Sequence, residues 1–153
     1  MAEPLITITK ATPAVLDKVL SLLRVVDLPH EGVKEHFEDF LVAVDGIGKI
    51  IGCIGLERHA KIGLLRSLAV HPDYQRHKIG TRLTYALLDI AAKDNLTEMV
   101  LLTTTAKDFF AKVFGFREAN RTRYNQALKD SPEWTLPRCS TAVFMKLALG
   151  KSK

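Results

Sequence analysis

The sequence holds only two cysteines, six prolines and nine glycines among 153 residues. A single pair, Cys53 and Cys139, is too little for the disulfide framework of a small secreted domain. So little proline and glycine argues against a linker-rich or disordered chain. No apolar run approaches the ~20 residues of a membrane span, and the start, MAEPLITITK, lacks the basic and apolar regions of a secretory signal. We therefore expect a cytoplasmic protein with no membrane partner.

Positive charge exceeds negative charge, with 22 lysines and arginines against 17 aspartates and glutamates and a net charge of +5. The excess favours an anionic partner. Basic residues do not interleave with aromatic ones, so nucleic acid is not the expected partner. The length and the 47% hydrophobic content suit one globular domain, and no repeat or linker divides the chain. We expect a single domain over residues 1–153.

Hydrophobic patterning predicts an α/β protein of the α+β type, with a mixed sheet of about six to seven strands flanked by helices. Apolar runs and alternation predict strands at residues 5–9, 40–44, 49–56, 64–70, 99–102 and 142–147. Helical spacing predicts helices from Pro13 to before Pro29, at 80–93 and 107–114, and short ones at 31–37 and 124–129. The early hairpins imply antiparallel pairs, and the strand–helix–strand unit after residue 64 implies a right-handed parallel crossover.

Residues 64–83, LLRSLAVHPDYQRHKIGTRL, combine an apolar strand, a Pro turn, a basic loop and a helix that starts near Gly80. The first amides of a helix have no partner within it, and the helix dipole adds positive charge there, so such an end binds anions. Arg76, Lys78 and Arg82 add full charges, and Gly80 lets a ligand approach the backbone. The pattern predicts a phosphorylated ligand, with a solvated basic helix start as the alternative.

Within that stretch, LAVHPDYQRHKIGTRL resembles the acetyl-CoA-binding motif of the GNAT superfamily of N-acetyltransferases. That motif reads Gln or Arg, two residues, Gly, one residue, then Gly or Ala. Gln75 and Gly80 match its ends, whereas Lys78 stands at the inner glycine. FFAKVFGF resembles the late helix and Gly-Phe turn of the superfamily, and the order of elements also matches. The resemblance implies a GNAT-like fold over most of the chain.

Other segments, among them DLPHEGVKEHF and IGCIGLER, are similar to the small acetyltransferases of bacterial arsenic-resistance operons. LTTTA and RCSTAV are similar to the acetyltransferase domain of N-acetylglutamate synthases. These likenesses imply an acetyl-CoA-dependent N-acetyltransferase that transfers acetyl directly to the amine of a small amino acid or analogue, glutamate-like or arsenical. Two alternatives stay open: acetylation of a protein N-terminus or lysine, and a non-catalytic domain that senses acyl-CoA.

Acetyl-CoA is the donor that the resemblance implies. Backbone amides from about Arg76 to Thr81 would bind the pyrophosphate, and residues 68–70 would pair with the pantetheine arm as an added strand. The amide near Leu68 would stabilise negative charge on the thioester oxygen, which makes Leu68 a candidate catalytic residue. The expected cofactor-binding residues are Leu68, Ala69, Val70, Gln75, Arg76, His77, Lys78, Ile79, Gly80, Thr81 and Phe110.

Glu57, directly after the predicted strand 49–56, is the candidate general base. An acceptor amine with a pKa of ~10 is mostly protonated at neutral pH and must lose a proton before it attacks, directly or through water. The alternative is an ordinary Glu at a strand end, paired with Arg58 or Arg66.

Many GNAT enzymes use a tyrosine on the late helix as the acid that protonates the departing thiolate. Phe109 and Phe110 stand there in this chain, and phenylalanine donates no proton. Because a thiol pKa of ~8.5 already makes thiolate a tolerable leaving group, no acid is required. Tyr124 is a candidate substitute from another loop.

Four residues are candidates to bind the acceptor. Arg66 and Arg138 suit a substrate carboxylate because the planar guanidinium binds both oxygens, and resemblance links Arg138 to the substrate. Thr103 and Thr104 follow a predicted strand and offer hydroxyls. The alternatives are surface or Glu-paired arginines, and threonines that serve the strand and cap the next helix.

No metal is expected. The segment HEGVKEH places Lys34 where the helical metalloprotease spacing needs a second histidine after His30. The expected partners are coenzyme A and a small-molecule amine, and resemblance to self-associating relatives suggests a homodimer.

Overall fold

The computed structural model describes residues 5–150 of a chain that divides into two compact units. The first unit comprises Met1–Leu56 and Ser67–Leu88, and the second comprises Glu57–Arg66 and Asp89–Lys153. Among the described residues, no helix is long and apolar enough to cross a membrane. The strands and α-helices are β1 (Thr7–Lys10), α1 (Leu16–Val25), β2 (Phe40–Val44), β3 (Ile50–His59), β4 (Ile62–Val70), α2 (Ile79–Lys93), β5 (Glu98–Thr103), α3 (Lys107–Phe114), β6 (Arg117–Glu118) and β7 (Val143–Ala148).

Seven strands pair in the order β1-β2-β3-β4-β5-β7-β6. The β1–β2 and β2–β3 pairs are antiparallel, as the hairpins predicted, and β4 pairs with β5 in parallel, as the strand–helix–strand unit predicted. β7 lies antiparallel between β5 and β6. The predicted mixed α/β sheet of six to seven strands flanked by helices is therefore confirmed.

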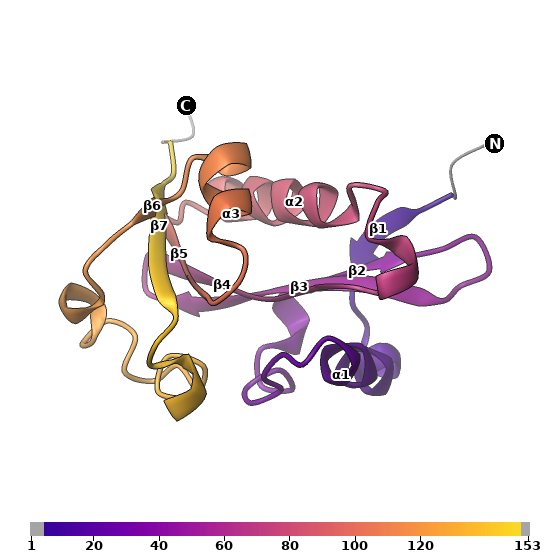
Figure 1. The fold of residues 1–153 in the computed structure, drawn as a ribbon, viewed down its shortest axis with the longest axis horizontal. Helices are drawn as coiled ribbons and strands as arrows, with labels where there is room; N and C mark the ends of the chain where they lie inside the picture. Colours follow the sequence, from indigo (N-terminus) through magenta and orange to yellow (C-terminus); the bar gives the residue numbers. More distant parts are fainter. Residues whose placement is uncertain (1–4, 151–153) are drawn as a thin grey trace. The chain divides into compact units, whose positions relative to one another are not determined.

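In the first unit, α1 covers one face of β2 and β3, and the first part of α2 covers the other face (Figure 1). Gly55 of β3 lies opposite Phe40 of β2 in the strand register. A Cβ on Gly55 would lie 2.2 Å from the Phe40 ring, so only glycine fits there. The core on the α1 side includes Val19, Leu22, Leu23, Val33, Phe37, Phe40, Val42 and Cys53.

In the second unit, β5 pairs with β7 along its whole length, from Glu98↔Ala148 to Thr103↔Val143. Trp134, from the long connection between β6 and β7, meets the Phe144 ring edge-on with centroids 5.2 Å apart. The buried cluster is Leu64, Val100, Leu128, Trp134 and Phe144. The segment 131–138 therefore has no regular strand but anchors a core through its tryptophan.

Two predicted short helices are wrong. Residues 31–36 form turns that end in the 3₁₀ turn Phe37–Asp39, because Gly32 has a φ of +83°, which no right-handed helix accommodates. Residues 125–130 are turns after the 3₁₀ turn Arg121–Tyr124.

The helix predicted from Pro13 begins with a 3₁₀ turn, Pro13–Val15, before α1. The two-residue β6 was not predicted, because so short a segment carries no periodicity.

Candidate functional site

The loop between β4 and α2 is tied closely to its flanking strand. The amide of His71 donates to the Ile51 carbonyl at 2.7 Å, which ends β4 against β3. The 3₁₀ turn Pro72–Tyr74 follows, with the His71 Nδ1 atom accepting from the Asp73 amide at 3.2 Å. Gln75 Nε2 then donates to the Val70 carbonyl at 3.3 Å, so the loop folds back over the end of its own strand.

Lys78 has a left-handed backbone, with φ = +56°, directly before α2. Its carbonyl accepts the Arg82 amide at 3.0 Å, which is the hydrogen bond that opens the helix. This is the position where the GNAT-like motif has its inner glycine, the residue that adopts positive φ without steric cost. The lysine therefore takes the conformation that the glycine would take, at a cost of about 1 kcal/mol.

The loop presents polar and cationic groups to solvent. Gln75, Arg76 and Lys78 are exposed, whereas Ile79 is buried and anchors the first turn of α2. The Arg82 side chain is engaged within the protein, because its Nη2 atom donates to the Ile6 carbonyl at 3.0 Å. A helix start with two exposed cations beside it can bind an anion such as a diphosphate.

β4 contains a second left-handed residue, Ser67, with φ = +60°. A positive φ within a strand interrupts the regular pleat, here directly before Leu68. The Cys53 thiol donates to the Ser67 carbonyl at 3.2 Å and holds this irregularity from β3. The sequence does not predict the left-handed backbone at Ser67, because serine has no preference for positive φ.

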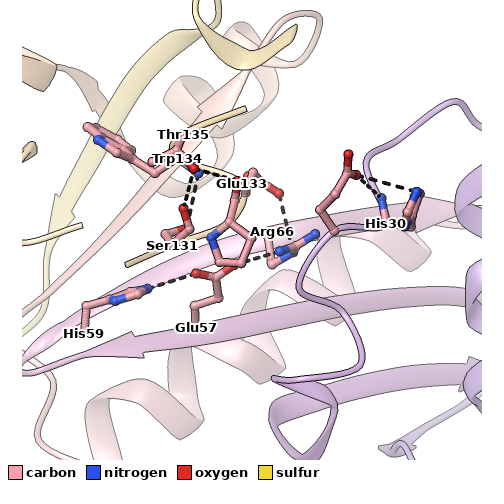
Figure 2. Close-up of polar contacts among 10 residues, drawn as sticks. His30, Glu57, His59, Arg66, Ser131, Glu133, Trp134 and Thr135 are labelled. Atoms are coloured by element: carbon pink, nitrogen blue, oxygen red, sulfur yellow. Dashed lines mark hydrogen bonds and ion pairs between the residues drawn. The ribbon is translucent and has the colours of Figure 1, made fainter. Parts of the chain in front are cut away.

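A buried cluster of charged side chains lies in the second unit, where Glu57 is bound from two sides (Figure 2). Glu57 Oε2 accepts from Arg66 Nη1 at 2.7 Å, and Oε1 lies 2.9 Å from His59 Nε2. The side chains of Glu57 and Arg66 have no exposed surface. The Glu57–Arg66 pair was one of the alternatives that the sequence left open.

A second carboxylate, that of Glu133, approaches the same guanidinium. Glu133 Oε2 lies 3.4 Å from Arg66 Nε, and its side chain is 7% exposed (Figure 2). Arg66 thus lies between two carboxylates. Glu133 was not predicted as a site residue, because it falls in the segment 131–138 that carries no periodic pattern.

The two carboxyl groups have opposite pKa shifts. Burial alone would raise the pKa of Glu57, but hydrogen bonds with His59, Ser131 and Arg66 outweigh it and hold the pKa below its ordinary value. Burial raises the pKa of Glu133 to about 7, since Arg66 compensates only in part and the negative charge of Glu57 adds to the rise. A pKa of about 7 leaves Glu133 divided between its protonated and ionised forms near neutral pH, whereas the lowered pKa of Glu57 keeps that group ionised.

The chain around Glu133 is held by Arg121. Its Nη1 atom donates to the carbonyls of Cys139 and Ser140 at 3.0 and 3.3 Å, and its Nη2 atom donates to the Trp134 carbonyl at 3.4 Å. The Arg121 guanidinium also lies 4.7 Å from the centroid of the Trp134 ring, a cation–π contact. The connection is therefore fixed although it has no strand pairing.

Several other predicted site residues are engaged within the protein. The Thr103 hydroxyl accepts the Ala106 amide at 2.9 Å and so serves the start of α3, while Thr104 is exposed. Phe110 is buried against the rings of Phe109, Phe114 and Phe116. Their predicted contacts with acceptor and cofactor stay predictions.

Two further predicted residues are Tyr124 and Arg138. The Tyr124 hydroxyl donates to Glu98, and burial together with this bond raises the pKa of Tyr124 to about 12, which makes it a poor acid. Arg138 belongs to the 3₁₀ turn Pro137–Cys139, and its side chain lies outside the described part of the structure. Over residues 5–150, no group of three or more His, Cys, Asp or Glu side chains is arranged to hold a metal.

Solved structures that superpose on this chain include N-acetyltransferases. The chain superposes on N-acetylglutamate synthase from Neisseria gonorrhoeae, complexed with coenzyme A and N-acetyl-glutamate, with a TM-score of 0.78 and 21% identity over 98% of this chain and 36% of that one. It superposes on the ribosomal-protein-S18-alanine N-acetyltransferase of Escherichia coli with a TM-score of 0.73 and 19% identity, covering 97% of both chains. The fold is that of the GNAT-type N-acetyltransferases.

The sequence comparison defines the family. Residues 16–116 match the profile of the Acetyltransferase (GNAT) family, so the chain belongs to that family. A curated relative, the uncharacterized N-acetyltransferase CT2212 of Chlorobaculum tepidum, is 29% identical over 99 residues, which are 64% of this chain and 62% of that protein. The chain thus spans less than two thirds of this relative's length and about a third of the N-acetylglutamate synthase chain.

Proposed function

We propose that the protein is an acetyl-CoA-dependent N-acetyltransferase that transfers acetyl directly to the amine of a small amino acid or amino-acid analogue. The observation that carries the proposal is the loop between β4 and α2. It follows the family's motif, it keeps a left-handed backbone at Lys78, and it exposes Arg76 and Lys78 beside a helix start. Family membership supports the same donor.

In this proposal the backbone amides of residues 76–81 hold the pyrophosphate, and residues 68–70 hold the pantetheine arm. The positive φ of Ser67 supports a role for the Leu68 amide as the donor that stabilises the thioester oxygen, because an irregular strand backbone can direct an amide toward a ligand. An amide fixed in this way needs no reorganisation as charge develops.

For the acceptor, we propose a small molecule with a carboxylate. The similarity of RCSTAV to N-acetylglutamate synthases supports Arg138 as its ligand. Arg66 is a less direct candidate, since its guanidinium already binds two carboxylates and would have to exchange one for the substrate. A glutamate-like acid and an arsenical analogue are the specific acceptors that the sequence resemblance suggests.

A protein N-terminus is the second candidate acceptor. The superposition on the enzyme that acetylates ribosomal protein S18 supports it, at the level of the fold alone. A peptide has no carboxylate near its reacting amine, so this alternative gives Arg138 no role.

Calorimetry with coenzyme A and an assay of thiol release test the proposal. Full-length protein and acetyl-CoA are incubated with the twenty free amino acids, an arsenical amino acid and a peptide that begins with alanine. We expect coenzyme A to bind and a free amino acid or analogue to be acetylated fastest. Tight binding without turnover on any amine would favour a sensor, and no binding at all would contradict the proposal.

A further inference from the structure

We propose that the hydrogen bond between Tyr74 and Asp45 positions the loop between β4 and α2 for coenzyme A. The inference rests on the proposed acetyl-CoA-dependent activity and adds two positioning residues to its donor site. Every group involved belongs to the first compact unit. Neither residue was predicted as a site residue from the sequence.

The turn between β2 and β3, residues 45–49, is built on the Asp45 carboxylate. Asp45 Oδ1 accepts the Ile47 amide at 3.1 Å and the Lys49 amide at 2.9 Å. The other oxygen, Oδ2, accepts from the Tyr74 hydroxyl at 3.1 Å. One carboxylate therefore shapes its own turn and also binds the loop between β4 and α2.

Tyr74 is held in the loop by its backbone and by its ring. Its amide donates to the His71 carbonyl at 2.8 Å, and its carbonyl accepts the His77 amide at 3.3 Å. Its ring centroid lies 6.2 Å from that of His71 and 6.3 Å from that of His77. The position of Tyr74 therefore constrains the backbone on both sides of it, up to the segment that leads into α2.

A cavity of about 560 Å³ lies between the turn and α1. Its lining includes Ile47 and Lys49 from the turn, Val25 from α1, and His71. Ile47 is 90% exposed and Val25 is 59% exposed, so apolar packing contributes little to the position of the turn. The connection between the turn and the loop depends on hydrogen bonds instead, and the bond from Tyr74 is one of them.

The loop needs this support because of the backbone of Lys78. A non-glycine residue with a φ of +56° persists only where the surrounding structure imposes that conformation. In the proposed donor site, the amides of residues 76–81 bind the pyrophosphate only while this backbone is held. A loop that already has its bound conformation loses less entropy when the ligand binds, and this increases affinity.

The bond joins a neutral donor to a charged acceptor. The amides of Lys49 and Ile47, together with the Tyr74 hydroxyl, hold the pKa of Asp45 below its ordinary value. The same bond raises the pKa of Tyr74. At neutral pH the carboxylate is therefore ionised and the hydroxyl keeps its proton, which makes the bond stronger than one between neutral groups.

The test compares the full-length wild type with Tyr74→Phe, which keeps the ring and removes the hydroxyl. We expect the Kd for coenzyme A and the KM for acetyl-CoA to rise about fivefold, while kcat at saturating acetyl-CoA changes little. Without coenzyme A, the amides of residues 75–80 should exchange with deuterium faster in the variant. Calorimetry, the thiol-release assay and hydrogen exchange measure these effects.

Tyr85→Phe is the matched control, because it removes the same hydroxyl from a tyrosine on α2 that is 55% exposed. It should keep the wild-type Kd. A double-mutant cycle then tests the partner: in an Asp45→Ala background, Tyr74→Phe should cause no further loss of affinity, because the bond is already absent. Thermal melts verify that each variant folds.

Two results would overturn the inference and leave the proposed function intact. One is a wild-type Kd and unchanged loop exchange in Tyr74→Phe. The other is the same fivefold loss from Tyr74→Phe with and without Asp45, which would mean that the hydroxyl acts through another group. A wild type that does not bind coenzyme A would overturn the proposed function and this inference with it.

Discussion

The loop between β4 and α2 and the cluster around Arg66 are both polar, yet they handle charge in opposite ways. In the loop, Arg76 and Lys78 are exposed, and water compensates their charges until a ligand arrives. In the cluster, protein groups compensate the buried Arg66 and Glu57. Exposed charges change affinity with little effect on stability, whereas buried charges couple stability to proton binding. Charge in the loop is therefore expected to affect ligand affinity, and charge in the cluster is expected to make stability depend on pH.

The largest expected effect comes from breaking the buried pair. Glu57→Ala leaves the Arg66 guanidinium with Glu133 at 3.4 Å and without its 2.7 Å partner. Removing one member of a buried ion pair costs about 3–5 kcal/mol. Urea unfolding at pH 7 measures the loss, with the exposed Glu35→Ala as a control that should change stability little. Equal stabilities for the two variants would contradict the contrast between buried and exposed charge.

The second effect depends on pH and concerns Glu133. Its pKa of about 7 lies above the ordinary 4.5, so the folded state binds more protons than the unfolded state between these values. Stability therefore falls as pH rises from about 4.5 to 7. Glu133→Gln removes this cost and should stabilise the protein at pH 8 by up to about 3 kcal/mol, with no gain at pH 4. Urea unfolding at both pH values checks it, and a gain independent of pH would contradict it.

The smallest effect on stability should come from the loop. Lys78→Gly and Lys78→Ala both remove the exposed charge, but only glycine relieves the positive φ. Lys78→Gly should therefore be more stable than Lys78→Ala by about 1 kcal/mol. Both should weaken coenzyme A binding several-fold, more at low salt than at high salt, since exposed charge is screened. Equal stabilities of Lys78→Gly and Lys78→Ala, with different affinities for coenzyme A, would contradict this prediction.

The sequence correctly predicted the elements whose pattern lies in consecutive residues. The bounds of β2 and α3 coincide with the predicted 40–44 and 107–114, because apolar runs and helical spacing are local signals. The basic loop was likewise predicted from consecutive residues. The left-handed Ser67 was not, since serine at positive φ is imposed by the surrounding sheet.

The charge cluster depends on contacts between distant residues. Glu57 was identified by its place after the predicted strand 49–56, whereas β3 continues to His59 and contains it. Its link to Glu133 passes through Arg66 and joins β3, β4 and the connection before β7. A single sequence contains no pattern that predicts contact between these distant residues. The contacts of Arg121 were missed for the same reason, because they fix a segment without periodicity.

Arg121 holds the connection before β7 at three points of its backbone, in addition to the contacts of Trp134 with Phe144 and of Glu133 with Arg66. Three backbone carbonyls of this segment depend on one guanidinium, which also covers the Trp134 ring. Loss of the Arg121 contacts should therefore loosen residues 134–140 together, so that their amides exchange with deuterium faster as a group. The carboxylate of Glu133 would become accessible to water in the same event.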